Sequence, residues 1–115
     1  KMIKDFNFIQ KGHIYYAKLP NNNSSIQSGK RPVLILGVYG NIVNIIPLTT
    51  KMKRMDLLSH IKVKSIDIKG NIKDSNCLLE QIQTIPKNDI LNLYGTISKE
   101  DKKRINNRLK QVISI

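Results

Sequence analysis

Five short runs of mainly β-branched and aliphatic residues constrain the fold of this 115-residue chain more than any other feature. Runs of this length, separated by polar or glycine-containing segments, are typical of β-strands. We expect strands over residues 13–19, 32–39, 41–48, 60–66 and 77–84. Gly40-Asn41 lies between the second and third runs and favours a tight turn, so these two strands should pair antiparallel. The pattern predicts a mainly β fold, a small barrel of five strands.

The C-terminal part of the chain carries a helical pattern. Ser98 followed by Asp101 resembles a capping box, with aspartate in place of the usual glutamate. Apolar residues then recur at helical spacing on one face: Ile105, Leu109, Val112 and Ile113. The opposite face is cationic and typical of a solvated surface: Lys102, Lys103, Arg104, Arg108 and Lys110. We expect this C-terminal α-helix to pack on the barrel, and a short helical turn to precede it over residues 86–93.

The length fits a single domain over residues 1–115, large enough to bury a core without disulfides. Cys77 is the single cysteine, so neither an internal disulfide nor a cysteine-rich zinc site is available, and we expect it to be a small buried hydrophobic residue. The sequence has no run of 18 apolar residues, and its N-terminus lacks the apolar core of a signal peptide. These features predict a cytoplasmic protein with no membrane partner.

The net charge of +12 indicates a polyanionic partner, for which nucleic acid and acidic protein segments are the common choices. Lysine, asparagine and isoleucine are abundant throughout the chain, as an AT-rich coding sequence would produce without functional selection. The charge alone therefore leaves the function open, and the motifs must decide it.

An arginine at a junction between a loop and a strand is the most distinctive polar motif. Residues 20–30 show no periodicity and predict a mobile surface loop, which leads into Arg31-Pro32 and the apolar run Val33–Leu36. A guanidinium is permanently charged and presents a planar fork of donors, so it can hold a phosphate in one orientation. We interpret Arg31 as a candidate phosphate-binding residue; a surface arginine beside a strand is the alternative.

Four blocks of sequence occur in an order and spacing that resembles one protein family. They are Gly12–Leu19, Ser24–Pro32, Ile45–Thr50 and Leu78–Ile85. Together they closely resemble the MazF/PemK toxins of bacterial type II toxin-antitoxin systems. The resemblance implies a small SH3-like barrel, with the fold of MazF and CcdB, that forms a homodimer. It also implies a cognate MazE-like antitoxin whose acidic, disordered tail binds the basic surface.

The same resemblance implies a chemistry. In the family, the residues that match Arg31 and Thr49 cleave single-stranded RNA without a metal ion or another cofactor; a one-residue error would select Thr50 instead. The ribose 2′-hydroxyl attacks the adjacent phosphorus and leaves a 2′,3′-cyclic phosphate and a 5′-hydroxyl end. Charge builds on the nonbridging oxygens, so a fixed guanidinium and a hydroxyl donor would stabilise the transition state. The expected function is a sequence-selective, metal-independent endoribonuclease toxin that cuts mRNA.

Other polar residues extend the candidate site. Glu80 lies where a related plasmid toxin has an acidic active-site residue, so it is a candidate general base or RNA contact; a strand carboxylate bonded to a neighbour is the alternative. Three polar groups could hydrogen-bond base edges or phosphate: Ser25, Gln27 and Gln81. Three further candidates for RNA contact are Lys30, Thr50 and Lys51. We expect the two histidines, His13 and His60, to be polar residues at strand ends rather than catalysts.

Aromatic residues, on which bases could stack, are few: Phe6, Phe8, Tyr15, Tyr16, Tyr39 and Tyr94. Successive side chains of a strand face opposite sides. One of Tyr15 and Tyr16 should therefore belong to the core.

Two residues depart from the family pattern and leave alternatives open. Ile26 stands where the family's loop has a glutamate, and Gln83 where an arginine is usual. They motivate a second hypothesis, a catalytically degenerate protein of the same fold that binds RNA with strong salt dependence and leaves it intact. A third hypothesis is a CcdB-like poison of DNA gyrase. Arg31-Pro32 and Leu48-Thr49 argue against it, because the resemblance assigns these blocks to the ribonuclease branch.

Overall fold

The computed structural model describes residues 9–20 and 29–113. In these residues it contains seven strands, two short 3-10 helices and one α-helix. In chain order they are β1 (His13–Leu19), β2 (Gly29–Tyr39), β3 (Ile42–Thr49), β4 (His60–Asp67), β5 (Ile72–Leu78), η2 (Leu79–Gln81), β6 (Gln83–Pro86), η3 (Lys87–Asp89), β7 (Ile90–Ile97) and α1 (Lys99–Val112). The described part of the chain has no helix with the length and apolarity needed to span a bilayer.

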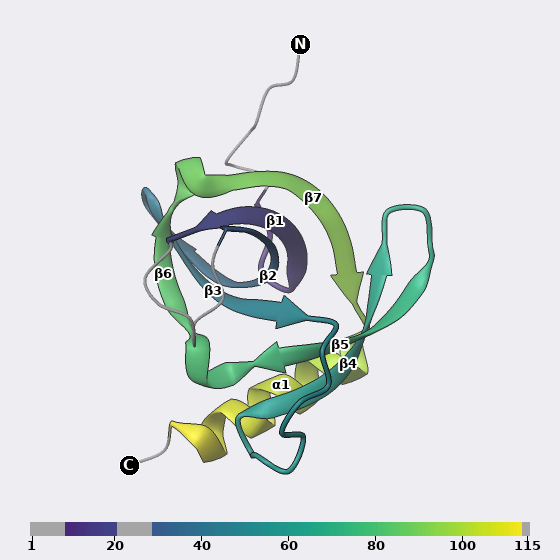
Figure 1. Ribbon diagram of the computed structural model, residues 1–115. Helices are drawn as coiled ribbons and strands as arrows, with labels where there is room; N and C mark the ends of the chain where they lie inside the picture. Colours follow the sequence, from purple (N-terminus) through teal and green to yellow (C-terminus); the bar gives the residue numbers. More distant parts are fainter. Residues whose placement is uncertain (1–8, 21–28, 114–115) are drawn as a thin grey trace.

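The strands close into a small barrel. Their order in the sheet is β2-β1-β7-β4-β5-β3-β6, and an additional pairing between β2 and β3 closes the ring (Figure 1). β5 and β6 pair one after the other with β3, and α1 lies across the part of the barrel formed by β4 and β5 (Figure 1). The predicted mainly β barrel with a C-terminal helix is therefore confirmed.

The hairpin of β2 and β3 forms as predicted. Tyr39 pairs with Ile42 across a turn in which Gly40 has a φ of +59°, a conformation that suits glycine. β2 begins at Gly29, three residues before the predicted start at Pro32. This extension pairs with β1, where Ala17 is opposite Arg31 and Leu19 opposite Gly29.

The predicted strand over residues 77–84 was wrong, because it spans the end of β5, the 3-10 helix η2 and the start of β6. Cys77 pairs with Leu48 near the end of β3, whereas Gln83 pairs with Ile45 further back, so the chain turns between the two pairings. β5 also begins earlier, at Ile72, in a segment too polar to show an apolar strand pattern. Local periodicity therefore predicts four of the seven strands in the described residues, and it misses β5, β6 and β7 as separate strands.

The helical turn predicted over residues 86–93 is also mostly wrong. Only Lys87–Asp89 forms a 3-10 helix, and β7 begins directly after it. Ile90 is fully buried and pairs with Ala17 of β1, so pairing in the barrel overrides the helical signal of the proline. Gly95 of β7 packs against the backbone of β4, where a Cβ would collide with the carbonyl oxygen of Ile66.

Apolar side chains fill two clusters, one on each side of several strands. The first lies beneath α1 and consists of Ile14, Leu34, Ile46, Leu48, Ile61, Val63, Cys77, Leu79, Ile97 and Ile105. The second consists of Ile9, Ala17, Leu19, Val33, Ile35, Val43, Ile45, Ile85 and Ile90. Consecutive residues of β2 and β3 enter different clusters, which explains why these strands are continuously apolar in sequence. Cys77 is buried as predicted, and burial raises the pKa of its thiol.

The helix α1 begins as predicted, with Ser98 as its N-cap. The Ser98 hydroxyl accepts a hydrogen bond from the backbone N–H of Asp101 at 3.1 Å. The capping box is incomplete, because the Asp101 carboxylate instead accepts from the backbone N–H of Lys64 and from Arg104. Ile105 is buried against the barrel, but Ile113 is exposed beyond the last helical residue, which corrects its assignment to the packed face.

Part of the cationic face of α1 binds the barrel rather than only facing solvent. Arg104 donates to the carbonyl oxygen of Lys62, and Arg108 donates to those of Leu58 and His60. These bonds fasten the helix to the start of β4 and the residues before it. The helix is thus held by polar bonds at its edge and by apolar contacts beneath it.

Candidate active site

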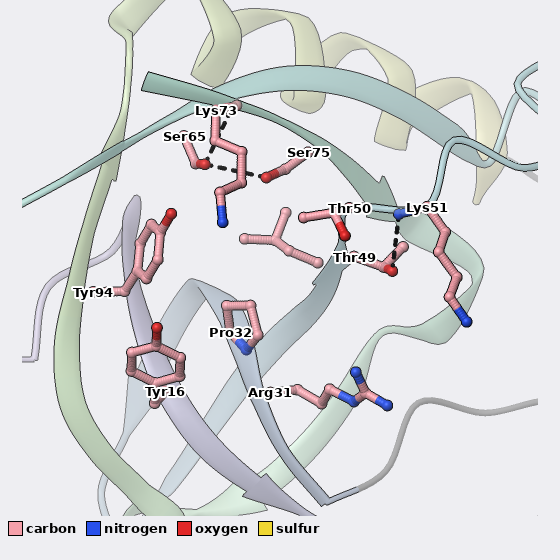
Figure 2. A pocket seen from close by; sticks show the side chains of 11 residues that line it. Tyr16, Arg31, Pro32, Thr49, Thr50, Lys51, Ser65, Lys73, Ser75 and Tyr94 are labelled. Carbon is pink, nitrogen blue, oxygen red and sulfur yellow. Dashed lines mark hydrogen bonds between the residues drawn. The ribbon is translucent and has the colours of Figure 1, made fainter. Parts of the chain in front are cut away.

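An open cavity of about 260 Å³ lies where β2 begins and β3 ends. Six of the seven strands in the described residues, all except β6, contribute side chains to its walls, so the barrel itself shapes the cavity. Its lining residues are Tyr16, Arg31, Pro32, Leu48, Thr49, Thr50, Lys51, Ser65, Lys73, Ser75 and Tyr94 (Figure 2). The structure therefore brings together Arg31, Thr49, Thr50 and Lys51, four of the residues expected to form the site.

The β2–β3 hairpin explains why Arg31 and Thr49 meet, although 17 residues of sequence lie between them. Val33 pairs with Pro47 in the antiparallel register. Arg31 lies two residues before Val33 and Thr49 two residues after Pro47, so both reach the same end of the hairpin. Each side chain is thus placed by a strand and not by a loop.

Thr49 has a defined hydrogen-bond partner. Its Oγ1 accepts from the backbone N–H of Lys51 at 3.2 Å. A hydroxyl has one hydrogen and two acceptor positions, so this bond leaves the hydrogen for donation to another group. Thr49 is half-buried, whereas the neighbouring Thr50 is exposed. In this geometry Thr49 can act as a hydroxyl donor toward the cavity.

The cavity is suited to an anion. Three cations, Arg31, Lys51 and Lys73, belong to its described lining, and that lining contains no carboxylate. The Lys73 side chain extends into the cavity, while Ser65 and Ser75 are hydrogen-bonded to each other at 3.1 Å behind it (Figure 2). The three cations are exposed residues, but their gathering around one concave surface focuses a positive field there, which attracts a phosphate.

Two aromatic rings form the wall opposite the threonines (Figure 2). Tyr16 and Tyr94 make an edge-to-face pair, with ring centroids 5.6 Å apart and planes inclined by 78°. Lys30 lies over the Tyr16 ring, its Nζ 5.0 Å from the centroid. Tyr15 packs on the second apolar cluster, so Tyr16 is the tyrosine that reaches the site and Tyr15 the one in the core. The cavity thus combines cations, hydroxyls and aromatic rings.

Glu80 and Gln81 lie in η2 and do not belong to the lining of this cavity. Glu80 Oε2 is 3.0 Å from His60 Nε2, and His60 Nδ1 is 2.8 Å from the carbonyl oxygen of Lys53. Burial opposes ionisation of Glu80, but hydrogen bonds from His60, from the backbone and from Ser59, together with the electrostatic attraction of His60, outweigh burial and lower the pKa of this carboxylate. His60 thus lies at a strand end, as predicted, and ties η2 to the residues before β4.

The remaining expected residues lie elsewhere. Ser25, Gln27 and Ile26 fall outside the described residues. His13 opens β1, and burial followed by the nearby charge of Lys102 lowers its pKa. Gln83 donates to the carbonyl oxygen of Gln81 at 3.5 Å. In the described residues no group of three or more His, Cys, Asp or Glu side chains could hold a metal ion.

Three lining residues were missed by sequence reasoning: Ser65, Lys73 and Ser75. Ser65 is opposite Lys73 in the β4–β5 pairing, and its hydroxyl donates to the Lys73 carbonyl at 3.1 Å. Recognition of β5 would have placed Lys73 and Ser75 on one face by their alternation, but its polar sequence hid the strand.

The sequence matches a family described as PemK-like, MazF-like toxins of type II toxin-antitoxin systems over residues 10–113. It is 29% identical over 106 residues to the endoribonuclease MazF of Staphylococcus saprophyticus, with 88% of each chain covered. Among solved structures it resembles the toxin MazF-mt6 of Mycobacterium tuberculosis, with a TM-score of 0.69, 21% identity, and 90% and 97% of the two chains covered. A mycobacterial endoribonuclease in complex with its cognate antitoxin gives a TM-score of 0.69 at 17% identity, covering 91% of this chain and 94% of the other.

Proposed function

Because the chain belongs to the PemK-like, MazF-like toxins of type II toxin-antitoxin systems, we propose that it is a sequence-selective endoribonuclease. Its substrate is single-stranded RNA, including mRNA, in the cytoplasm. The names of its relatives support this activity, since the Staphylococcus protein is an endoribonuclease. The single observation that carries the proposal is the meeting of Arg31 and Thr49 at one cationic cavity.

The proposed reaction uses the substrate's own nucleophile. The 2′-hydroxyl oxygen bonds to the adjacent phosphorus and the bond from phosphorus to the 5′ oxygen breaks. A base removes the 2′-hydroxyl proton, and an acid supplies a proton to the departing 5′ oxygen. The products are a 2′,3′-cyclic phosphate and a 5′-hydroxyl end. Because the nucleophile belongs to RNA, the protein needs no activated serine, cysteine or metal-bound water, and DNA is inert.

Arg31 and Thr49 act on the phosphate that reacts. Negative charge increases on its nonbridging oxygens as the 2′ oxygen approaches, so donors that are already in place stabilise the transition state. Arg31 supplies a permanent charge and a planar set of donors, and Thr49 supplies the hydroxyl hydrogen that its bond from Lys51 leaves available. Both donors are held by paired strands, so little reorganisation accompanies the reaction.

The tyrosines and Lys73 bind the nucleotides beside that phosphate. Stacking of a base on an aromatic ring contributes about 1–3 kcal/mol per base and tolerates any base. Tyr16 and Tyr94 offer such rings, and Lys73 offers a cation for a neighbouring phosphate. Sequence selection therefore requires hydrogen bonds to base edges, for which Ser25, Gln27 and Gln81 remain proposed donors and acceptors.

A cognate antitoxin and a second copy of the chain are the proposed protein partners. A net charge of +12 favours binding of an acidic, disordered segment that folds onto the surface and excludes RNA. The mycobacterial relative that was solved with its cognate antitoxin supports this type of partner. The homodimer is proposed from the resemblance of the four sequence blocks to the MazF/PemK toxins.

The test is RNA cleavage in EDTA. Purified protein is incubated with a long defined RNA, and new ends are mapped by primer extension beside the Arg31→Ala variant. We expect discrete cuts with 5′-hydroxyl ends, which the variant loses by about 100- to 1000-fold. Equal cleavage by Arg31→Ala would refute the role of Arg31, and cleavage that stops in EDTA would refute metal independence. RNA that is bound but left intact would favour the degenerate RNA-binding protein.

A further inference from the structure

A buried asparagine beside the cavity has no part in the chemistry described above. Asn76 lies on β5, is 1% exposed, and is the register partner of Thr49. It does not line the cavity. Burial of an amide removes its bonds to water, so the side chain is costly unless the protein replaces them. The hydrogen bonds of Asn76 show whether its amide nitrogen Nδ2 or its amide oxygen Oδ1 is paired.

The amide nitrogen of Asn76 holds the segment that follows Thr49. Nδ2 donates to the carbonyl oxygen of Lys51 at 3.2 Å and lies 3.5 Å from that of Lys53. Within the described structure, the buried Oδ1 of the same amide has no hydrogen-bond partner. Turning the amide over would set Oδ1 against two carbonyl oxygens, so these acceptors fix its orientation. The fold therefore retains the donor and tolerates the unsatisfied acceptor.

Lys51 connects this contact to Thr49. Its carbonyl oxygen accepts from Asn76, and its N–H donates to Thr49 Oγ1 at 3.2 Å. A threonine hydroxyl rotates easily. The hydrogen bond from the Lys51 N–H keeps a lone pair of Thr49 Oγ1 toward the backbone, so the hydroxyl hydrogen is directed away from it. We propose that Asn76 is a positioning residue that holds Lys51 in place and thereby keeps the Thr49 hydroxyl turned to donate its hydrogen to the RNA phosphate.

The segment that follows Thr49 is attached to the barrel at Lys53 as well as at Lys51, so loss of the Asn76 amide should affect mainly Lys51. The carbonyl oxygen of Lys53 also accepts from His60 Nδ1 at 2.8 Å, which is shorter than its contact with Asn76. Loss of the Asn76 amide therefore releases Lys51, whereas Lys53 stays attached. Lys51 is an exposed residue, so we expect its carbonyl oxygen to bond to water in place of the amide.

The variant Asn76→Val separates positioning from stability. Valine suits a buried strand, lacks the donor, and also removes the unsatisfied Oδ1, so the thermal midpoint should equal or exceed that of the parent. If Asn76 positions Thr49, kcat should nevertheless fall by about 10- to 100-fold with KM unchanged. The matched control is Asn44→Val, because Asn44 is also a strand asparagine with a hydrogen-bonded side chain: its Oδ1 accepts from the Thr84 hydroxyl at 2.7 Å. Its kcat should match that of the parent.

A double variant shows whether Asn76 acts through Thr49. Adding Asn76→Val to Thr49→Val should cause no further loss, since the hydroxyl to be positioned is already absent. The role of Asn76 is overturned by an unchanged kcat in the single variant, or by an equal additional loss in the Thr49→Val background. This role rests on the proposed function. A parent that cleaves no RNA overturns both, whereas a cleaving parent with an equally active Asn76→Val overturns only the positioning role.

Discussion

Thr49 and Thr50 form a matched pair with which the assignment of the catalytic hydroxyl can be tested. Both line the cavity, but only Thr49 belongs to β3, and the Thr49 Oγ1 accepts from the N–H of Lys51. Substitution by valine removes the hydroxyl and keeps the branched shape. In Thr49→Val the lost bond involves an exposed backbone, so the cost in stability should be at most about 1 kcal/mol. The loss of a transition-state donor is larger, about 2.7–4 kcal/mol, which is 100- to 1000-fold in kcat.

The assay is single-turnover cleavage of a short RNA that contains a mapped cut site, with thermal unfolding followed on the same samples. We expect Thr49→Val to lose 100- to 1000-fold in rate while its unfolding midpoint changes little, and Thr50→Val to cleave like the parent. A Thr50→Val variant that is the more impaired of the two would show that the assignment is wrong by one residue. Two fully active variants would refute a hydroxyl donor at this end of the hairpin.

Three further predictions concern the rest of the structure. Because Cys77 is buried and its thiol pKa is raised, iodoacetamide at pH 8 should label the protein only after denaturation; rapid labelling of native protein would contradict the burial. Gly95→Ala forces a Cβ onto the carbonyl oxygen of Ile66 and should destabilise the fold by about 1–3 kcal/mol in urea titrations. The pKa of Glu80 is lowered in the folded state, so its bond to His60 stabilises the protein above the unfolded pKa of about 4.3 and is lost as pH falls through the folded value. Glu80→Gln should therefore be less stable than the parent at neutral pH but not under acid conditions, and should keep its cleavage rate; a loss of about 100-fold would instead make Glu80 the general base.

The parts of the fold that the sequence predicts well are those with a local signal. The apolar run of β1 gives its bounds at His13 and Leu19, and Ser98 marks the start of α1. β5 has no such signal, because residues such as Lys73 and Asp74 are polar and the strand is specified by its pairing with β4. A pairing partner remote in sequence cannot be inferred from periodicity alone.

The candidate site likewise contains residues that the sequence predicts and residues that only the fold brings there. Arg31 and Thr49 could be proposed because the blocks around them resemble a family, and the hairpin register then explains why they meet. Lys73 carries no motif, and it reaches the cavity only because β5 pairs beside β3 and β4. The contacts of Asn76 with the backbone of Lys51 likewise depend on folding and not on any local pattern.

The placement of Arg31 and Thr49, the proposed catalytic pair, bears on the departures from the family pattern. Arg31 is fixed by its pairing with Ala17, and Thr49 by its pairing with Asn76, so both positions follow from strand registers. Gln83 pairs with Ile45 at a different part of β3. The departure at Gln83 therefore leaves the strand registers of Arg31 and Thr49 intact. If the protein is a ribonuclease as proposed, we expect Gln83 to affect contacts with RNA outside the Arg31–Thr49 pair, and so to change the sequence that is cut more than the ability to cut.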